Sequence, residues 1–348
     1  MGFLDVTSSL TGRRWVGPAP EIERQAEAIR QETALPLPLC LTLARQGVAP
    51  HEASGYLEPQ LRDLLPDPHR LKDMDRAAQR FLLAVQTRQR IAIFADYDVD
   101  GGASAALLLW WLRTMGRDAT LYIPDRIDEG YGPNVPAMQA LGQAHDLIIC
   151  VDCGTLSHDP IAAAGCDVII LDHHLGGETL PTALACVNPN RQDENGELGH
   201  LCAASVTFLM LVEANRQLRA AEATGPDLMA LLDLVALATV ADVAPLIGVN
   251  RALVRQGLKV MARRERPGIV ALADAGERVF HIKAVDEIGL VSLAANSVAA
   301  AVAPPDNVTA FDVIPQGDHV RASWEPVEGT GVEYELRAGT TWGTGRFV

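Results

Sequence analysis

The spacing of apolar and polar positions divides the chain into regions of different secondary structure. Up to residue 90, apolar residues recur at helical spacing in segments such as EIERQAEAIRQE and MDRAAQRFLLAVQTRQ. From residue 91, short runs that are apolar at almost every position alternate with helical segments, as in DLIICVDCG and DVIILDHH. Strands buried on both faces and joined by helices are typical of a parallel, doubly wound sheet. We therefore expect an N-terminal helical segment over residues 1–90, packed on an α/β domain over residues 91–275.

Turn signals and changes of pattern set the expected limits of the other elements. The helices of the α/β region are predicted over residues 103–115 and 135–143, with a short one around 158–165. Residues 202–264 are helical again and extend the domain. Around residue 275 the pattern changes to short alternating segments such as ERVFHIKAVDEIG and VEYELRAG, separated by Gly, Pro and Asn. We place a domain boundary near Gly276 and expect an all-β tail, an incomplete β-sandwich, over residues 276–348.

The composition is that of an ordinary globular protein. The chain has 348 residues, enough for two or three domains, and no apolar run approaches the roughly 20 residues of a membrane helix. The first residues, MGFLDVTSSLTGRRW, lack the charged start and apolar core of a secretory signal. The six cysteines are scattered rather than arranged as a disulfide framework. We therefore expect a protein of the reducing cytoplasm that has no membrane partner.

The formal net charge of −15 argues against a broad basic surface for nucleic acid. It does not exclude a local nucleic-acid site, because a divalent cation can join an acidic protein to a phosphate backbone. An acidic, cation-binding site is therefore compatible with a phosphate-containing substrate.

Acidic and imidazole side chains follow three of the predicted strands. They are Asp96, Asp98 and Asp100 after the first strand, Asp152 after LIICV, and Asp172, His173 and His174 after VIIL. The carboxyl ends of parallel strands meet at one edge of the sheet, so these groups should lie close together. Buried carboxylates that lie close together repel one another. We therefore expect a cation at this edge of the sheet.

The donor types favour particular metals and a particular chemistry. Carboxylate oxygens with one or two imidazoles suit Mn²⁺ or Mg²⁺ better than the thiolate-rich sites of zinc or iron–sulfur clusters. With at least four carboxylates, two ions are compatible with the site. Two ions about 3.5–4 Å apart activate a water and hold both oxygens of an in-line phosphoryl displacement. The sequence therefore predicts phosphoester hydrolysis.

Less specific explanations exist for several of these residues. A single Asp after a strand is more often a helix cap than a metal ligand, but three such strand ends make capping a poor joint explanation. Asp172 has an alternative role, orienting His173 from behind. Cys150 and Cys153 form a CxxC that is better explained by packing. For Arg126, in the loop DRIDEGYGPN, contact with substrate phosphate and a simple turn remain equal alternatives.

Four stretches, DYDVDG, VDCG, LDHH and ATVADVAPL, match in order the four motifs of the DHH phosphoesterase superfamily. The chain most resembles the RecJ type of single-stranded-DNA-specific exonuclease, over roughly residues 14–274. Supporting stretches include GYLEPQLRDLLPDP, IPDRIDEGYG and VNPNRQD. The resemblance implies a 5′-to-3′ exonuclease that uses Mn²⁺ or Mg²⁺, acts on single-stranded DNA in repair and recombination, and has a single-stranded-DNA-binding protein or a helicase as partner.

Carried over by position, the resemblance also implies the roles of individual residues. The implied metal ligands are Asp96, Asp98, Asp100, Asp152, His173 and Asp242. Asp152 would bridge the two ions and is counted as catalytic. His174, the second catalytic residue, would donate to the scissile phosphate. The assignment of Asp242 rests on the resemblance alone.

The chain departs from the RecJ pattern in two places. Phe94 and Ala95 stand where the family has a glycine, usually after a histidine, before the first motif. The DHH-associated domain with its Gly-Gly-His signature and the oligonucleotide-binding barrel are not visible. Residues 277–348 instead resemble fibronectin type III modules of phage tail proteins, the second of which would end mid-fold at Val348. We therefore expect metal binding to be retained and exonuclease activity to be impaired, since loss of a substrate clamp costs positioning.

Two other functions remain open. One is a small-substrate DHH phosphoesterase that hydrolyses short oligonucleotides, cyclic dinucleotides or pyrophosphate; such enzymes lack the N-terminal helical segment. The other is non-enzymatic, either a metal-free DHH scaffold or a phage tail module. Scaffolds of that kind lose metal-site carboxylates, whereas this chain retains all of them.

Overall fold

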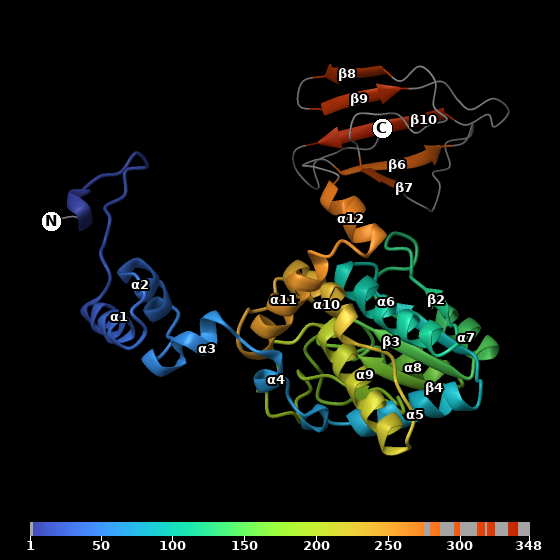
Figure 1. The fold of residues 1–348 in the computed structure, drawn as a ribbon. Helices are drawn as coiled ribbons and strands as arrows, with labels where there is room; N and C mark the ends of the chain where they lie inside the picture. Colours follow the sequence, from blue (N-terminus) through green and yellow to red (C-terminus); the bar gives the residue numbers. More distant parts are fainter. Residues whose placement is uncertain are drawn as a thin grey trace. The chain divides into compact units, whose positions relative to one another are not determined.

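The computed structural model of the chain describes residues 3–274 and, beyond them, the strands 279–285, 296–299, 312–316, 319–323 and 333–339. The chain forms two compact units, Met1–Lys259 and Val260–Val348 (Figure 1). No helix among the described residues is long and apolar enough to cross a membrane.

The first unit contains a five-stranded parallel sheet with the order β2-β1-β3-β4-β5. The strands are β1 (Ile91–Ala95), β2 (Thr120–Tyr122), β3 (Leu147–Val151), β4 (Asp167–Leu171) and β5 (Ala185–Val187). Every residue of β1 and β3 is buried, which explains their continuous apolar runs. The parallel α/β fold expected from the sequence is confirmed.

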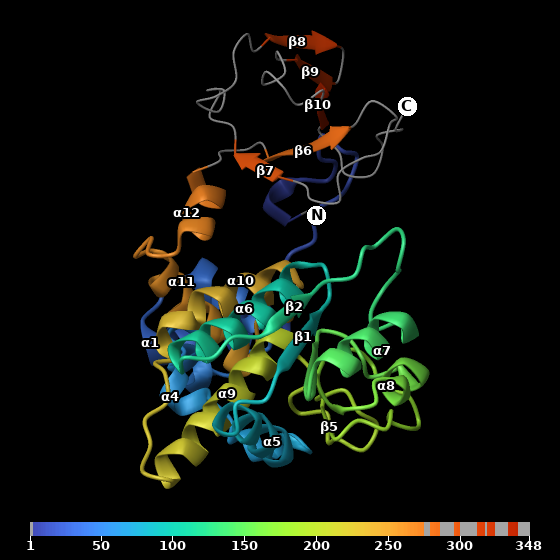
Figure 2. The ribbon, with the colours of Figure 1, turned by 90° about the vertical axis from the view of Figure 1, so that its right-hand side faces the viewer.

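Helices cover both faces of this sheet (Figure 2). On one face, α7 (Val135–Ala144) and α8 (His158–Ala163) share an apolar cluster with the strands. On the other face lie α6 (Val99–Thr114) and α9 (Ala203–Ala220), with α10 (Leu232–Ala241) and α5 (Met74–Gln86) packed against them. Cys150 and Cys153 are buried in the cluster on the α7 side, in agreement with the packing interpretation of the CxxC.

Helix α6 begins at Val99, earlier than the predicted start at 103. Gly101 and Gly102, outside the predicted range, both lie inside the helix. The cause is Asp98, whose side chain caps the helix by accepting hydrogen bonds from the backbone N–H groups of Asp100 and Gly101 at 2.8 and 3.0 Å.

Short helices precede the sheet. They are η1 (Phe3–Asp5), α1 (Pro20–Thr33), α2 (Leu37–Arg45), η2 (Pro50–Glu52), α3 (Ala53–Leu57), α4 (Leu61–Leu64) and η3 (Pro68–Arg70). Helices α1 and α2 share their own apolar cluster, which includes Ile29 and Leu43. After η4 (Met229–Leu231), α11 (Gly248–Met261) contributes Arg251, whose guanidinium lies 3.7 Å from the ring centroid of Tyr56 and donates to the Tyr56 carbonyl.

The second unit contains α12 (Pro267–Asp274) and an antiparallel sheet with the order β7-β6-β10-β9-β8. Its strands are β6 (Val279–Val285), β7 (Asn296–Ala299), β8 (Asp312–Gln316), β9 (His319–Ser323) and β10 (Glu333–Gly339). The expected boundary near Gly276 and the expected end at Val348 lie outside the described residues. The division at residue 276 and the fibronectin-like assignment of this tail stay predictions.

Candidate metal centre

Three strand ends and one helix end deliver the site residues to one edge of the parallel sheet. Asp96 follows β1, Asp152 follows β3, and His173 and His174 follow β4. Asp242 is the residue that ends α10. Because the strands are parallel and in register, their carboxyl ends lie side by side, and the side chains that follow them meet.

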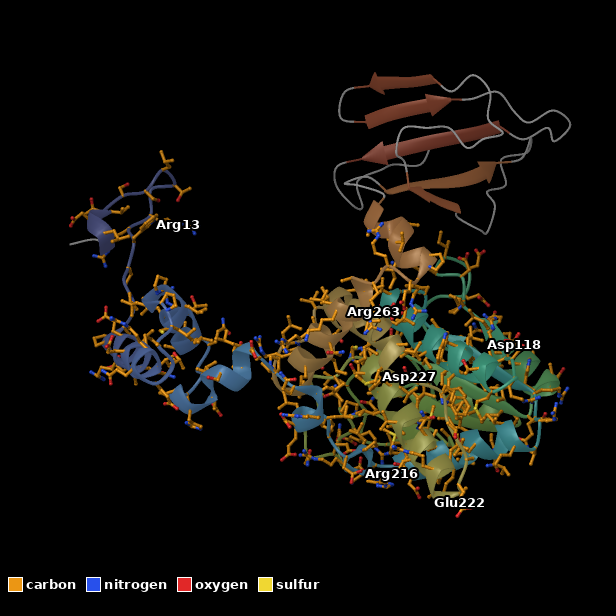
Figure 3. All side chains as sticks on the ribbon, in the orientation of Figure 1. Arg13, Asp118, Arg216, Glu222, Asp227 and Arg263 are labelled. Carbon is orange, nitrogen blue, oxygen red and sulfur yellow. The ribbon has the colours of Figure 1, made fainter. Side chains whose placement is uncertain are left out.

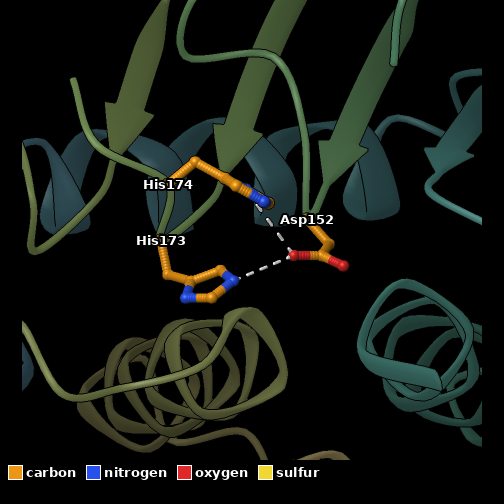
Figure 4. Close-up of side chains that lie close together, drawn as sticks. All are labelled: Asp152, His173 and His174. Atoms are coloured by element: carbon orange, nitrogen blue, oxygen red, sulfur yellow. Dashed lines mark ion pairs between the residues drawn. The ribbon is translucent and has the colours of Figure 1, made fainter. Parts of the chain in front are cut away.

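Asp152 and His173 lie at the centre of the arrangement. The Oδ1 atom of Asp152 lies 3.3 Å from Nε2 of His173 and 3.9 Å from Nδ1 of His174 (Figure 4). Nε2 of His173 is also 3.7 Å from Oδ2 of Asp100, and its Nδ1 is 3.8 Å from Oδ2 of Asp242. One imidazole therefore faces carboxylates from three separate segments of the chain.

The donor atoms form three overlapping groups in which all atoms lie within 4.8 Å of one another. The groups are Asp96–Asp98–Asp152, Asp152–His173–His174 and Asp100–His173–Asp242. Asp152 and His173 each belong to two of these groups. The structure thus brings together every site residue expected from the sequence, including Asp242, and the overlap fits two neighbouring cations with Asp152 between them.

Burial distinguishes these carboxylates from those on the surface. Asp96, Asp100 and Asp152 are 3%, 1% and 1% exposed, whereas Asp118 and Glu222 lie at the exposed periphery of the first unit (Figure 3). Taking a carboxylate out of water without a partner is costly, so burial of several together requires compensation.

The raised pKa values of these carboxyl groups reflect the cost of burying their ionised forms. Burial raises the pKa of Asp96, Asp100 and Asp242. Burial, together with the charges of Asp100 and Asp98, raises the pKa of Asp152 to about 10. Among the described residues, no group donates a hydrogen bond to the buried Oδ1 atoms of Asp96 and Asp152. Buried oxygens that accept no hydrogen bond and lie beside other hard donors fit a divalent cation.

Two of the carboxylates also interact with helix N-termini. Asp98 caps α6 through Oδ1, so the helix-cap alternative describes this residue correctly, yet Asp98 still belongs to a donor group with Asp96 and Asp152. The carboxylate of Asp100 accepts from the backbone N–H groups of Ala203 and Ala204 at 2.6 and 2.8 Å, at the start of α9. Capping fixes the positions of both side chains without removing them from the site.

Asp172 orders the turn that carries the two histidines. It accepts from the backbone N–H groups of His173 and His174 at 2.7 and 3.2 Å, from Nδ1 of His174 at 2.8 Å and from the N–H of Thr155 at 3.1 Å. Burial opposes ionisation, but these hydrogen bonds outweigh it and lower the pKa of Asp172 to about 2. The same hydrogen bond raises the pKa of His174.

The expected partner of Asp172 was wrong. The sequence interpretation had Asp172 orienting the ring of His173, but it holds the ring of His174 and contacts only the backbone of His173. The reason lies in the turn after β4: Nδ1 of His174 lies within hydrogen-bond distance of Asp172, while the ring of His173 faces Asp152 (Figure 4) and Asp242.

The sequence pattern did not point to Tyr131, which contacts the site from the loop after β2. Its hydroxyl donates to the Asp152 carbonyl oxygen at 3.1 Å and lies 3.1 Å from Nε2 of His174. The flanking Gly130 and Gly132 have φ values of 82° and 73°, which only glycine adopts readily. The sequence signal that could have identified Tyr131 as a site residue is its position between two glycines in a long loop.

The same loop contains Arg126, whose guanidinium lies 5.2 Å from the ring centroid of Tyr97. The backbone N–H groups of Ile127 and Asp128 donate to Oδ1 of Asp125, so this part of the loop is a turn. A contact between Arg126 and substrate phosphate stays a prediction.

Comparisons with known proteins agree with this geometry. Residues 90–239 match the family model described as "DHH family, N-terminal domain". Among curated proteins, the single-stranded-DNA-specific exonuclease RecJ of Dickeya dadantii is 40% identical over 264 residues, covering 71% of this chain and 45% of that protein. The RecJ of Bacillus subtilis is 33% identical, covering 74% of this chain and 32% of that protein.

Two solved structures resemble the chain in fold. One, exonuclease RecJ bound to manganese, is 33% identical with a TM-score of 0.52, covering 60% of this chain and 53% of that chain. The other, RecJ from Thermus thermophilus in complex with Mn²⁺, is 30% identical with a TM-score of 0.59, covering 73% of this chain and 36% of that chain.

Residues 90–239 therefore match the DHH family over a parallel α/β sheet. Within that class, the resemblance to the RecJ exonucleases is confirmed over the region that these matches cover. The chain spans less than half the length of the two curated relatives described here.

Proposed function

We propose that the chain is a metal-dependent phosphodiesterase of the RecJ type, a 5′-to-3′ exonuclease on single-stranded DNA with reduced activity in this form. The observation that supports this most strongly is the position of Asp152. It is 1% exposed, has a buried oxygen that accepts no hydrogen bond among the described residues, and belongs to two donor groups. A buried carboxylate in that position is suited to bridging two cations.

The residues that would hold the ions are Asp96, Asp98, Asp100, Asp152, His173 and Asp242. We propose Mn²⁺ or Mg²⁺, because the donors are oxygens and one imidazole and because the RecJ structures with a similar fold contain Mn²⁺. When bound, such ions supply an activated water and neutralise charge on the phosphate.

The protein's own groups would orient the substrate. His174 is 44% exposed at the edge of the site, and Asp172 fixes its ring from one side. With Nδ1 donating to Asp172, Nε2 is the atom that would donate to a non-bridging oxygen of the scissile phosphate, in place of its contact with the Tyr131 hydroxyl, and stabilise the charge that develops there.

The chain spans less than half the length of these relatives, so an activity like theirs is a proposal for it. Single-stranded DNA is the proposed substrate, and a single-stranded-DNA-binding protein or a helicase is the proposed protein partner. A cytoplasmic location is proposed because the six cysteines are free thiols.

The test is nucleotide release by the full chain with Mn²⁺. Single-stranded DNA labelled at the 5′ end should yield labelled mononucleotides at once, while 3′-labelled strands should shorten gradually. Asp152→Asn should abolish release. Equal release by wild type and Asp152→Asn contradicts the proposal. Hydrolysis of dinucleotides or cyclic dinucleotides without attack on long strands also contradicts it and favours the small-substrate alternative.

A further inference from the structure

Asn190 joins two backbone segments of the site that lie far apart in the sequence. Its side-chain Nδ2 donates to the carbonyl oxygen of His173 at 2.5 Å and to the carbonyl oxygen of Gly199 at 3.2 Å. Its own backbone N–H donates to Oδ1 of Asn188 at 2.7 Å, which fixes the orientation of the loop after β5. The amide therefore acts as a bridge between the segment of His173 and the segment of Gly199.

The second of these segments leads directly to the groups that hold Asp100. Gly199 precedes Cys202, the N-cap of α9, and the next two residues, Ala203 and Ala204, donate their N–H groups to the Asp100 carboxylate. A Cβ at position 199 would lie 2.7 Å from Oδ1 of Asn190, so a side chain there would have to displace the Asn190 amide. Asn190 is thus connected through a short, tightly packed segment to the position of Asp100.

His173 and Asp100 are members of one donor group. Nε2 of His173 lies 3.7 Å from Oδ2 of Asp100, and Asp242 completes the group. These three donors come from different segments of the chain. The distances between them therefore depend on the hydrogen bonds that join those segments. Groups outside the ligand set that orient the ligands commonly change metal affinity by about 10–100-fold when removed.

The donor group Asp96–Asp98–Asp152, which does not include His173, is fixed differently. Asp98 is held by the N-terminus of α6, and Asp96 and Asp152 directly follow β1 and β3. None of the hydrogen bonds described for Asn190 reaches these residues. A change at Asn190 should therefore affect the two groups unequally.

We propose that Asn190 is a positioning residue of the metal centre. It sets the separation of His173 from Asp100, and through that separation it sets the affinity of the Asp100–His173–Asp242 group for its cation. This inference rests on the proposed function, because it assumes that the centre binds two divalent ions.

The test is equilibrium titration of the metal-free full chain with Mn²⁺, followed by the electron paramagnetic resonance signal of free Mn²⁺. Wild type should take up two ions. Asn190→Ala should lower the Mn²⁺ affinity of one site by about 10–100-fold and change the affinity of the other site by less than about threefold. Asn190→Ser, which retains one donor, should give an intermediate affinity and serves if Asn190→Ala does not fold.

Asn215→Ala is the matched control. Asn215 also makes two side-chain hydrogen bonds, to the Pro226 carbonyl at 2.7 Å and from Nε1 of Trp111 at 2.9 Å, but it contacts none of the metal donors. This variant should lower the unfolding temperature and leave both Mn²⁺ affinities unchanged. In Asn190→Ala, high Mn²⁺ should restore most of the nuclease rate, a rescue that a purely structural role does not predict.

The possible outcomes separate the two proposals. A wild-type chain that takes up no Mn²⁺ contradicts the proposed function and, with it, this inference. A wild type that binds two ions and an Asn190→Ala variant that binds both equally well overturn the inference alone. The inference is also overturned if both Mn²⁺ affinities fall equally in Asn190→Ala and Asn190→Ser, in proportion to the loss of stability. That result is expected of a residue that only stabilises the fold.

Discussion

Nδ1 of His174 lies 2.8 Å from Oδ1 of Asp172 in the turn that follows β4. This hydrogen bond joins a half-exposed imidazole to a carboxylate that is 1% exposed. The same carboxylate accepts two backbone N–H groups of the turn, so it fixes the chain and the ring together. The first histidine, His173, faces the buried carboxylates, and the second, His174, lies at the more exposed edge of the site.

The stability of the metal-free protein should depend on Asp172 at acidic pH. Its pKa is lowered to about 2 in the folded protein, against 3.8 ordinarily. The ionised form therefore stabilises the fold above pH about 4, and this contribution, about 2 kcal/mol, is lost as the pH falls through about 2. Urea unfolding in a chelator from pH 2 to 5 should show this loss in wild type. Asp172→Asn should lack it, and identical acid profiles for the two proteins contradict the assignment.

The stability of the metal-free protein should also fall at alkaline pH because of Asp152. Its pKa is raised to about 10, so between pH about 4 and 10 the folded chain binds a proton that the unfolded chain does not. The free energy of unfolding must then decrease as pH rises through this window. Asp152→Asn removes the effect and should make the metal-free protein more stable than wild type at pH 8.

Thermal unfolding in EDTA measures this effect, and Asp118→Asn is the control. Asp118 is exposed and its pKa is lowered, so its loss should not change the profile between pH 5 and 9. Added Mn²⁺ should raise the unfolding temperature of wild type, and more at pH 8 than at pH 5. A wild type whose metal-free stability is flat over this range is inconsistent with a raised pKa of the buried Asp152 carboxyl.

Gly101 should be intolerant of a side chain. A Cβ at this position would overlap the backbone carbonyl of Asp96. Gly101→Ala should therefore displace Asp96, destabilise the protein by about 1–3 kcal/mol and weaken Mn²⁺ binding. Gly102→Ala is a closely matched control, because nothing lies within 4 Å of a Cβ there. It should be neutral or stabilise by about 0.5–1 kcal/mol. Equal effects in denaturant melts would argue against close packing at Gly101.

Tyr131→Phe should lower the rate of hydrolysis without weakening metal binding. The change removes the hydroxyl that contacts the Asp152 carbonyl and His174, while the ring remains edge-on to His174 at 5.6 Å. Loss of one or two neutral hydrogen bonds corresponds to a decrease of about 2- to 10-fold in kcat/KM. Steady-state kinetics and a Mn²⁺ titration on the same samples check this. A loss of Mn²⁺ affinity equal to the loss of rate contradicts a role restricted to His174.

The main features of the site could be predicted because they depend on short stretches of sequence. A buried apolar run such as IAIFA predicts a strand, the parallel sheet places its end beside others, and the residue that follows, Asp96, must then lie at the shared edge. Helix α7 was expected over 135–143 and is observed at Val135–Ala144, because Asn134 caps it and His145 ends it.

Other contributions depend on tertiary contacts that no local pattern encodes. Asp242 ends a helix that is apolar on every side, so periodicity gives no indication that it reaches the strand ends, and only the motif resemblance identified it. Tyr131 and Asn190 act through hydrogen bonds to the backbone of distant residues. The early start of α6 follows from the cap by Asp98.

The most direct test of the account is an anomalous difference map from crystals of the full chain soaked in Mn²⁺. We predict two peaks about 3.5–4 Å apart at the carboxyl edge of the parallel sheet. One should lie among Asp96, Asp98 and Asp152 and the other among Asp100, His173 and Asp242. A map with no peak at this edge, from crystals in which these side chains are ordered, would contradict the claim that the strand ends form a divalent-metal centre.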